Sequence, residues 1–359
     1  MPEPLKNAYN KQYIDRLIDS FLISVPDFND DLFHQKVFDE DWEGRELKSR
    51  MDHIAKVIYE VLALDYVEVL RVLKPVCENF GGYEAMFFPH IIELFGLDDW
   101  ADSMVALEHM TKFSSSEFAV RPFIVRSPQK MMKQMLRWSS HDNYHVRRLA
   151  SEGCRSRLPW AMALPAFKND PSLILPILET LKNDDSEYVR KSVANNINDI
   201  AKDNPDLVKS LASQWLGDTK NTDWIVKHGC RTLLKNADAD VLRLFGYVPR
   251  KDVEISDFLM VDDTVDIGGE IRFSFLLSSK DSLLGMLRIE YAIDYMKSNG
   301  SHSRKIFKIS EGNIQTKSKS IRRKQSFKNM STRKHYQGQH ALAVIVNGEE
   351  IGCVSFSVM

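Results

Sequence analysis

The first 110 residues repeat apolar side chains at the spacing of an α-helix. Apolar positions recur three and four residues apart, which predicts helices that each bury one face, with proline and glycine between them. The periodic segments are YIDRLIDSFLI (13–23), ELKSRMDHIAKVIYEVL (46–62), YVEVLRVLKPVCENF (66–80) and AMFFPHIIELFGL (85–97). Because they carry no catalytic motif, we expect a helical cap that covers the helices after it.

The middle of the chain repeats one amphipathic helix three times. In the first copy, Val146, Leu149, Ala150 and Gly153 fall at i, i+3, i+4 and i+7, so a helix beginning near His141 buries that side. Its opposite side is then expected to be a solvent-facing polar surface. The other two copies are DDSEYVRKSVANNINDIAKDNP (184–205) and TDWIVKHGCRTLL (222–234).

Aligning the three copies brings their polar faces into register. Val146 corresponds to Val189 and Ile225, at spacings of roughly 43 and 36 residues that suit a two-helix repeat of the HEAT type. Stacked repeats keep equivalent faces aligned, so we expect a continuous basic groove that contains one acid, Glu152. The polar positions are Arg148, Lys191 and Lys227 at one level, Glu152, Asn195 and Arg231 at the next, and His145, Arg155, Asn198 and Lys202 beside them.

The pattern changes after Pro249. Apolar and polar residues then alternate over short segments separated by polar turns, and Asn347-Gly348 is a hairpin turn signal. The segments are DVEISDFLMV (252–261), TVDIGGEIRFSFLLS (264–278), LLGMLRIEYAIDYM (283–296), RKIFKIS (304–310) and HALAVIVNGEEIGCVSFSV (340–358). We therefore expect a mainly α chain, in which a HEAT-like α-solenoid is followed by a small all-β sandwich of about 110 residues.

This pattern predicts two domains. Residues 1–247 are expected to form the helical domain, with the cap at 1–110 and the repeats at 111–247. Residues 248–359 are expected to form the sandwich.

Charge is distributed unevenly over a chain whose formal net charge is −2. Residues 1–100 hold 20 Asp and Glu against 10 Lys and Arg, whereas residues 301–340 hold 11 Lys and Arg against one Glu. Such opposed charges favour a polyanionic partner on the basic parts. The run NIQTKSKSIRRKQSFKNMSTRKHYQ (313–337), in which cations alternate with Phe327 and Tyr336, suits a phosphate-binding strand or loop, or else an ordinary solvated hairpin.

The chain shows no pattern of a metal, disulfide or membrane protein. Its four cysteines have no CxxC spacing, which argues against a disulfide framework and a zinc site. His141 and His145 lack a third ligand at suitable spacing, so we expect no metal and no cofactor. Because the sequence has neither a signal peptide nor an apolar run of about 18 residues, we expect a cytoplasmic protein that makes no membrane contact.

Several polar residues have structural interpretations that compete with functional ones. Glu152 can be an i,i+4 ion-pair partner of Arg148, and Glu117 follows Ser114 at the spacing of a capping box. Trp160, which follows a proline, can be a packed interface residue.

Three further residues have structural interpretations. Asp199 can form a structural ion pair with Lys191 or Lys202, and His228 is either structural or a phosphate contact. Trp138 is assigned to the core.

Four strings of the helical part, in this order and with compatible spacing, resemble one family. They are SEFAVRPF (116–123), HDNYHVRRLASEGCRSRLPWA (141–161), YVRKSVANNINDIAKDNPD (188–206) and DWIVKHGCRTLL (223–234). The family is that of the bacterial DNA alkylation repair glycosylases AlkC, relatives of AlkD built from HEAT-like repeats. The resemblance covers about residues 1–245, and the strand-rich end is similar to the immunoglobulin-like domain of one AlkC branch.

The resemblance implies an activity. The family excises cationic bases, 3-methyladenine and 3-methylcytosine, from duplex DNA by hydrolysing the N-glycosidic bond, without flipping the base into a pocket. A carboxylate would stabilise the oxocarbenium-like sugar and activate water. The implied catalytic residues are Glu152, Glu117 and Asp199, and Trp160 would bind the damaged nucleotide. The residues expected to bind DNA are Arg121, His145, Arg148, Arg155, Arg157, Lys191, Asn195, Lys202, Lys227, His228, Arg231, Arg322, Arg323 and Lys324.

We therefore expect a monofunctional glycosylase that acts as a monomer on alkylated double-stranded DNA, with no obligate protein partner. A second interpretation keeps the fold without the chemistry. In it, the chain is a non-catalytic HEAT-repeat scaffold that binds nucleic acid or an acidic partner through the same groove. That scaffold would bind in a salt-sensitive way and release no base.

Overall fold

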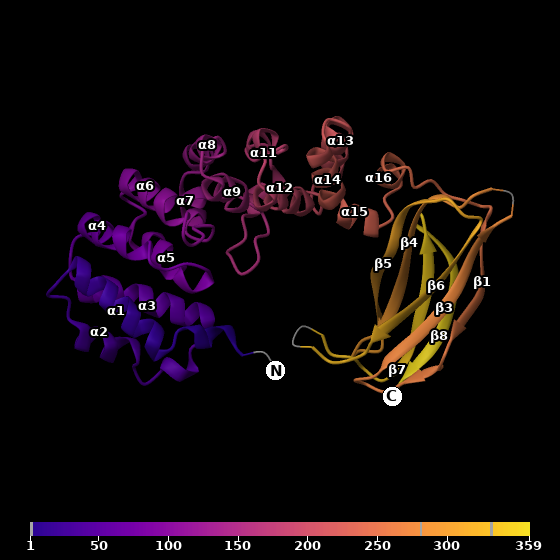
Figure 1. Ribbon diagram of the computed structural model, residues 1–359, viewed down its shortest axis with the longest axis horizontal. Coiled ribbons are helices and arrows are strands. Elements are labelled where there is room, and N and C mark those ends of the chain that lie inside the picture. Colours follow the sequence, from indigo (N-terminus) through magenta and orange to yellow (C-terminus); the bar gives the residue numbers. More distant parts are fainter. Residues whose placement is uncertain (1–2, 281, 331–332) are drawn as a thin grey trace. The chain divides into compact units, whose positions relative to one another are not determined.

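The computed structural model describes residues 3–280, 282–330 and 333–359. The chain divides into two compact units (Figure 1): a helical unit, residues 1–208 with 214–229, and a strand unit, residues 209–213 with 230–359. The packing thus places residues 230–247 in the strand unit. The predicted domain boundary between residues 247 and 248 stays a prediction. No described helix combines the length and the apolar composition needed to cross a membrane.

The first part of the helical unit contains the four predicted helices and two more. Asn10, Asn29 and Asp65 cap α1, α2 and α4, because each side chain accepts a hydrogen bond from the backbone N–H three residues on. Pro75 lies inside α4 and does not end it. The helices are α1 Lys11–Ser24, α2 Asp30–Val37, α3 Leu47–Leu62, α4 Tyr66–Cys77, α5 Phe87–Phe95 and α6 Trp100–Met110, with short 3₁₀ turns at Leu5–Ala8, Trp42–Gly44 and Tyr83–Ala85.

The second part stacks helices in pairs, which confirms the two-helix repeat. Helix α8 lies against α9, α11 contacts α9 and α12, and α12 contacts both α9 and α14 (Figure 1). Val146, Val189 and Ile225, the aligned core positions, are all fully buried. The helices are α7 Val120–Arg126, α8 Pro128–Trp138, α9 Tyr144–Glu152, α10 Pro165–Asn169, α11 Leu175–Leu181, α12 Glu187–Ile200, α13 Pro205–Trp215, which both units share, and α14 Lys220–Gly229.

The third predicted copy is wrong in its second half. Helix α14 ends at Gly229, and a separate helix, α15 (Arg231–Lys235), follows Cys230. The backbone of Cys230, at φ −81° and ψ 5°, leaves the helical conformation. Arg231 therefore does not continue the polar face of α14.

The strand unit is a two-sheet sandwich, as predicted. One sheet has the order β1-β3-β6 and the other β2-β8-β7-β4-β5; neighbours are antiparallel except the short β2 beside β8. Phe273 and Phe275 from the first sheet and Ile289, Ile293 and Leu342 from the second share one core. The strands are β1 Val253–Met260, β2 Thr264–Val265, β3 Glu270–Ser279, β4 Gly285–Met296, β5 His302–Ile314, β6 Ser318–Ser326, β7 Gly338–Val346 and β8 Glu349–Val358, and α16 spans Ala239–Leu244.

The predicted Asn347-Gly348 turn joins β7 to β8 and is confirmed. Both residues have positive φ, 48° and 86°, as this kind of hairpin turn requires. The Asn347 side chain is buried, accepts from Arg288 N at 2.7 Å and donates to Val248 O at 2.7 Å. The turn therefore also fastens the chain that enters the first strand.

Candidate active site

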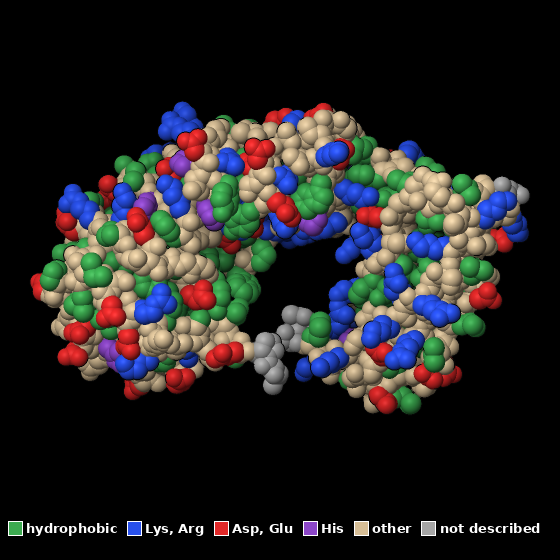
Figure 2. All heavy atoms as spheres, in the orientation of Figure 1, with side chains coloured by type: hydrophobic (Ala, Val, Ile, Leu, Met, Phe, Trp, Pro, Cys, Tyr) green, Lys and Arg blue, Asp and Glu red, His purple; other side chains and the backbone are tan. Residues whose placement is uncertain are grey.

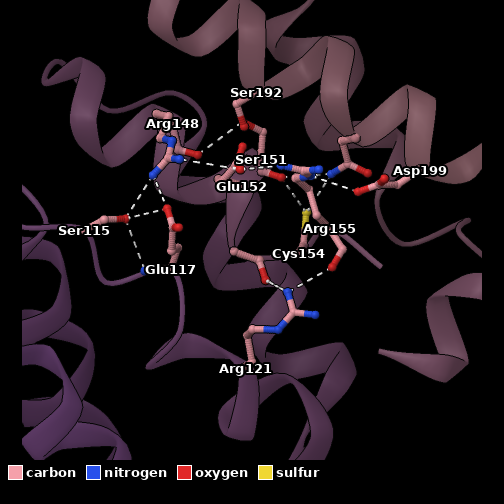
Figure 3. A network of polar contacts seen from close by, with 12 residues as sticks. Ser115, Glu117, Arg121, Arg148, Ser151, Glu152, Cys154, Arg155, Ser192 and Asp199 are labelled. Atoms are coloured by element: carbon pink, nitrogen blue, oxygen red, sulfur yellow. Dashed lines mark hydrogen bonds and ion pairs between the residues drawn. The ribbon is translucent and has the colours of Figure 1, made fainter. Parts of the chain in front are cut away.

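Three carboxylates and two guanidinium groups form one ionic network in the helical unit (Figure 3). Arg148 Nη1 pairs with Glu117, and Arg148 Nη2 lies 3.5 Å from Glu152 Oε1. Arg155 Nη1 donates to the same Glu152 oxygen at 2.6 Å, and Arg155 Nε donates to Asp199 Oδ2 at 2.9 Å. The three residues implied as catalytic therefore belong to one chain of alternating charges.

The packing of two repeat helices places these groups. Helix α9 begins after Asn143, whose side chain caps its first turn, and it carries Arg148 and Glu152 one turn apart. The hydroxyls of Ser151 on α9 and Ser192 on α12 share a hydrogen bond of 2.7 Å. The contact between α9 and α12 places the carboxylate of Asp199, on α12, beside the guanidinium group of Arg155, which follows α9.

The network is buried, which corrects the expected solvent-facing surface. Glu152 is 5% exposed, Arg155 7% and Asp199 2%. The polar side of α9 is covered because α12 packs against it, and α12 supplies Asp199 as a partner for Arg155. The ion pair between Glu152 and Arg148 exists, but Glu152 makes its shorter bond to Arg155. Buried Arg155 is thus committed to two carboxylates and is not a free phosphate contact.

The arginines of the network remain cationic. Burial acts to lower the pKa of Arg148, but the charges of Glu152 and Glu117 raise it above its ordinary value. Burial likewise opposes the charge of Arg155, and Glu152 and Asp199 raise its pKa. Both guanidinium groups are therefore positively charged at neutral pH.

Glu117 does not form the capping box that its spacing with Ser114 allowed. The Ser114 hydroxyl donates to Gly82 O at 2.8 Å, and α7 begins without a side-chain cap. The Glu117 carboxylate instead accepts from Ser115 Oγ at 2.8 Å and from Arg148. The capping interpretation is wrong, and the carboxylate points into the ionic network.

A pocket of about 380 Å³ opens beside Glu117. Glu117 and Arg148 line it, whereas Glu152 does not. Burial and the nearby Arg148 lower the pKa of His145, another lining residue, so its ring is neutral at pH 7. The remaining lining residues are Gly82, Tyr83, Met86, Thr111, Phe113, Ser114, Ser115 and Tyr188.

Two residues of this site were missed by sequence reasoning. Ser115 Oγ accepts from Arg148 Nη1 at 2.9 Å while it donates to Glu117. The Tyr188 ring lies 4.7 Å from the Arg148 guanidinium carbon. The repeat alignment contained the signal for Tyr188, because it occupies the position equivalent to His145 in the next repeat.

Trp160 is exposed, so the interpretation of Trp160 as a packed interface residue is wrong. Its side chain is 63% exposed, and its backbone has φ +65°, in the left-handed region. Lys48 Nζ donates to the Trp160 carbonyl at 2.7 Å. Trp138, in contrast, is 2% exposed and in the core, as predicted.

Arg121 was expected to bind DNA, and the structure contradicts this. Its side chain is fully buried and donates to three backbone carbonyl groups, those of Gly153, Arg155 and Met162. No part of its guanidinium group is available to a phosphate.

Apart from Arg121 and Arg155, the cations expected to bind DNA in the repeats are at least partly accessible. Lys191 is exposed and pairs with Glu187 at 2.7 Å, and the exposed Lys202 pairs with Asp199 at 3.1 Å. Arg157 is exposed and pairs with Asp203 at 2.6 Å. Half-buried positions are Asn195, Lys227, His228, which stacks on Trp224, and Arg231, whereas Asn198, placed on the same face by the sequence, is buried.

Part of the basic run 313–337 lies on β6. Arg322, Arg323 and Lys324 are exposed, and Figure 2 shows Lys and Arg side chains gathered over this unit. Phe327 is fully buried in the sandwich core, so its expected alternation with the cations at the surface is wrong; Tyr336 is 38% exposed. Positions 331–332 of the run lie outside the described residues.

Two family models match the chain. The one described as "DNA alkylation repair enzyme" matches residues 108–236, and the one described as "Uncharacterised protein YhaZ, C-terminal Ig-like domain" matches residues 254–359. The uncharacterized protein YhaZ of Bacillus subtilis (strain 168) is 47% identical over 356 residues, 99% of each chain.

A solved structure is similar over the whole chain. It is that of the Pseudomonas fluorescens alkylpurine DNA glycosylase AlkC, bound to DNA containing an abasic site analog. The TM-score is 0.96 at 36% identity, and the match covers 99% of this chain and 100% of that one. The chain therefore belongs to the AlkC family of DNA alkylation repair enzymes, in the branch that carries a C-terminal immunoglobulin-like domain.

Proposed function

We propose that this chain is a DNA glycosylase of base excision repair that hydrolyses the N-glycosidic bond of cationic alkylated bases, 3-methyladenine and 3-methylcytosine, in duplex DNA. The ionic network carries the proposal, because it gathers Glu117, Glu152 and Asp199 from three segments of the helical unit. Membership of the family supports the class of reaction, and the DNA-bound relative supports the substrate.

The proposed chemistry needs a carboxylate more than an acid. A base methylated at N3 is positively charged, so it departs with the electrons of the glycosidic bond and becomes neutral. The sugar is left as an oxocarbenium-like cation, which a nearby carboxylate stabilises. Water then forms the new bond to C1′, and the carboxylate accepts the proton that this water loses.

We assign different tasks to the two glutamates. Glu117 lines the pocket and its side chain is 14% exposed, whereas that of Glu152 is 6% exposed. Glu117 therefore meets the attacking water. Glu152, held by Arg148 and Arg155, supplies fixed negative charge at the sugar, and Asp199 fixes Arg155.

Trp160 and the accessible cations provide recognition. An exposed indole face attracts a cationic base by about 0.5–2 kcal/mol, and neutral bases gain less. Lys191, Lys202 and Arg157 are exposed and suited to phosphates. Phosphate contacts along stacked helices can sustain a bent duplex, which would expose the lesion without flipping the base. We propose a monofunctional enzyme, because exposed Lys191 lacks the desolvation that activates a Schiff-base lysine.

Replacing Glu152 with glutamine tests the proposal. The change removes the charge and keeps the shape, so release of 3-methyladenine should fall by about 100-fold or more, while binding to duplex containing an abasic-site analogue survives. The substrate is a duplex with one 3-methyldeoxyadenosine, treated with alkali after incubation to cleave any abasic site. Single-turnover rates are compared below the melting temperature of both proteins.

Glu187→Gln is the matched control. Glu187 is an exposed acid on α12 that pairs with Lys191, so its loss should leave base release unchanged. Normal excision by Glu152→Gln would overturn the assignment. Salt-sensitive binding by the unaltered chain without any base release would instead identify the non-catalytic scaffold.

A further inference from the structure

Arg121 joins three segments of the candidate site. It lies on α7, four residues after Glu117, and its side chain is fully buried. Its Nη1 donates to Gly153 O and to Arg155 O, both at 2.9 Å, and its Nε donates to Met162 O at 2.7 Å. One guanidinium group thus holds the end of α9 (Figure 3) and, through Met162, the far side of the loop that carries Trp160.

The end of α9 lies tightly against α7 at this point. A Cβ atom on Gly153 would lie 2.6 Å from Val120 Cγ2 and 3.0 Å from Leu149 O, which leaves no room for a side chain. Gly153 directly follows Glu152, and Val120 directly precedes Arg121. The Arg121 guanidinium group therefore reaches its acceptors where α7 packs against the end of α9. The same packing fixes the position of Glu152, the residue before Gly153.

The loop between α9 and α10 is also held nearer its ends, where Arg157 pairs with Asp203 at 2.6 Å and the side chains of Leu158 and Leu164 are buried. Inside it, Leu164 N donates to Ser156 O at 3.1 Å and Ala161 N donates to Leu158 O at 3.3 Å. At its tip, Lys48 donates to the carbonyl of Trp160, whose backbone is left-handed. Because little of the Trp160 side chain is buried, packing of the ring cannot hold the loop in place.

Arg121 keeps its charge at this site although it is buried. Burial lowers the pKa of Arg121 to about 10, so the side chain is still cationic at neutral pH. The planar guanidinium group of arginine donates to several carbonyl groups at once, whereas the single ammonium group of lysine cannot reach all of them. Loss of the guanidinium group of Arg121 would leave buried carbonyl oxygens without hydrogen-bond donors.

We propose that Arg121 is a positioning residue that holds Trp160 and Glu152 in fixed relation to each other and does not touch DNA. This inference rests on the proposed glycosylase function. A displacement of reacting groups by about 1 Å costs about 100-fold in rate. Weakening the hydrogen bonds of Arg121 should therefore slow base release without weakening the phosphate contacts.

Arg121→Lys is the test, and Arg126→Lys is its control on the same helix. Arg126 is exposed and pairs with Asp98 at 2.5 Å. Single-turnover release of 3-methyladenine is measured below both melting temperatures, together with affinity for a duplex that contains an abasic-site analogue. We expect Arg121→Lys to lose about 10- to 100-fold in rate with affinity within about two-fold, and Arg126→Lys to lose neither.

Trp160 supplies a readout that a purely structural role would leave unchanged. Acrylamide quenching of Trp160 is obtained by subtracting the emission of a matched Trp160→Phe chain, and Arg121→Lys should alter it. A rate for Arg121→Lys within about two-fold of the unaltered chain would overturn the inference, as would unaltered Trp160 quenching. If the unaltered chain releases no base, the proposed function itself fails, and the two failures are distinguishable.

A second measurement needs no variant, so the inference can still be tested if Arg121→Lys does not fold. Hydrogen exchange on the full chain should show slow exchange for the amides of Ala161 and Leu164, because a clamped loop keeps their hydrogen bonds closed. Exchange of these amides at the rate of unprotected peptide would show that the loop is not held, and the inference would be wrong.

Discussion

The conformation of Trp160 is not explained by stability. A left-handed backbone costs a residue other than glycine about 1–2 kcal/mol, and an exposed ring recovers little of that by burial. A side chain kept at such a cost is a candidate for ligand contact. Packing therefore does not explain the conformation of Trp160, and its proposed contact with the damaged nucleotide remains to be tested.

Replacing Trp160 with glycine separates these two roles. Glycine adopts the same backbone without strain but costs conformational entropy, so the free energy of unfolding should stay within about 1 kcal/mol. Release of 3-methyladenine should fall by about 2- to 30-fold, the equivalent of the lost cation–π attraction. Urea unfolding and single-turnover excision measure the two. A loss of several kcal/mol in stability would instead show a packing role.

At this scale the sequence reveals residue types but not the direction of each side chain. Glu117, Glu152, Asp199 and Trp160 could be proposed as site residues because they stand inside strings typical of the family. Arg121 stands in the same kind of string, and its inward direction depends on carbonyl groups more than 30 residues away along the chain. No local spacing encodes such a contact.

At the scale of elements, one histidine links α3 to α5. His90 Nε2 lies 3.0 Å from Asp52 Oδ1 and His90 Nδ1 lies 2.9 Å from Glu93 Oε2. Burial acts to lower the pKa of His90, but hydrogen bonds and charge from Glu93 and Asp52 raise it above its ordinary value near 6.5. The protonated ring therefore bridges two acids in the folded chain.

This bridge predicts a stability that depends on pH. Because the folded pKa is raised, His90 stabilises the fold fully below the unfolded pKa of about 6.5, and this contribution is lost as pH rises through the folded pKa. We expect the difference in unfolding free energy between the unaltered chain and His90→Gln to be larger at about pH 5.5 than at about pH 8.5. Urea unfolding at both values measures it. His53→Gln, on α3, controls for the loss of a histidine as such. An equal difference at both pH values would contradict the bridge.

Elements with a strong period were predicted well, and those that depend on tertiary contacts were not. The apolar stripe of α12 and the alternation of β3 are visible in the sequence, whereas β4 is buried along most of its length. The break at Cys230 has no proline and follows only one glycine, so nothing local distinguishes it from a continuing helix. The burial of Glu152 likewise depends on α12, which packs against α9, whereas its countercharges, Arg148 and Arg155, come from α9 and the loop after it.

At the scale of the whole molecule, two regions of the chain carry opposite net charge. The first 100 residues carry an excess of acids and the run around β6 an excess of cations. Three of those cations, Arg322, Arg323 and Lys324, are exposed on an edge strand. Because DNA affinity falls with salt in proportion to the number of phosphates neutralised, the contribution of β6 can be counted.

Replacing all three β6 cations with glutamine should weaken binding to duplex DNA and flatten its salt dependence. Each lost phosphate contact lowers the slope of log affinity against log salt by about 0.9, so three contacts lower it by about 2.7. Lys324 also pairs with Glu270 at 3.0 Å, which competes with a phosphate and makes 2.7 an upper bound. Fluorescence anisotropy across a salt series measures the slope. The matched control replaces three exposed cations of the acidic segment, Lys11, Lys56 and Arg71. Equal slopes for the two triple variants would show that net charge alone acts and that β6 makes no contact with DNA.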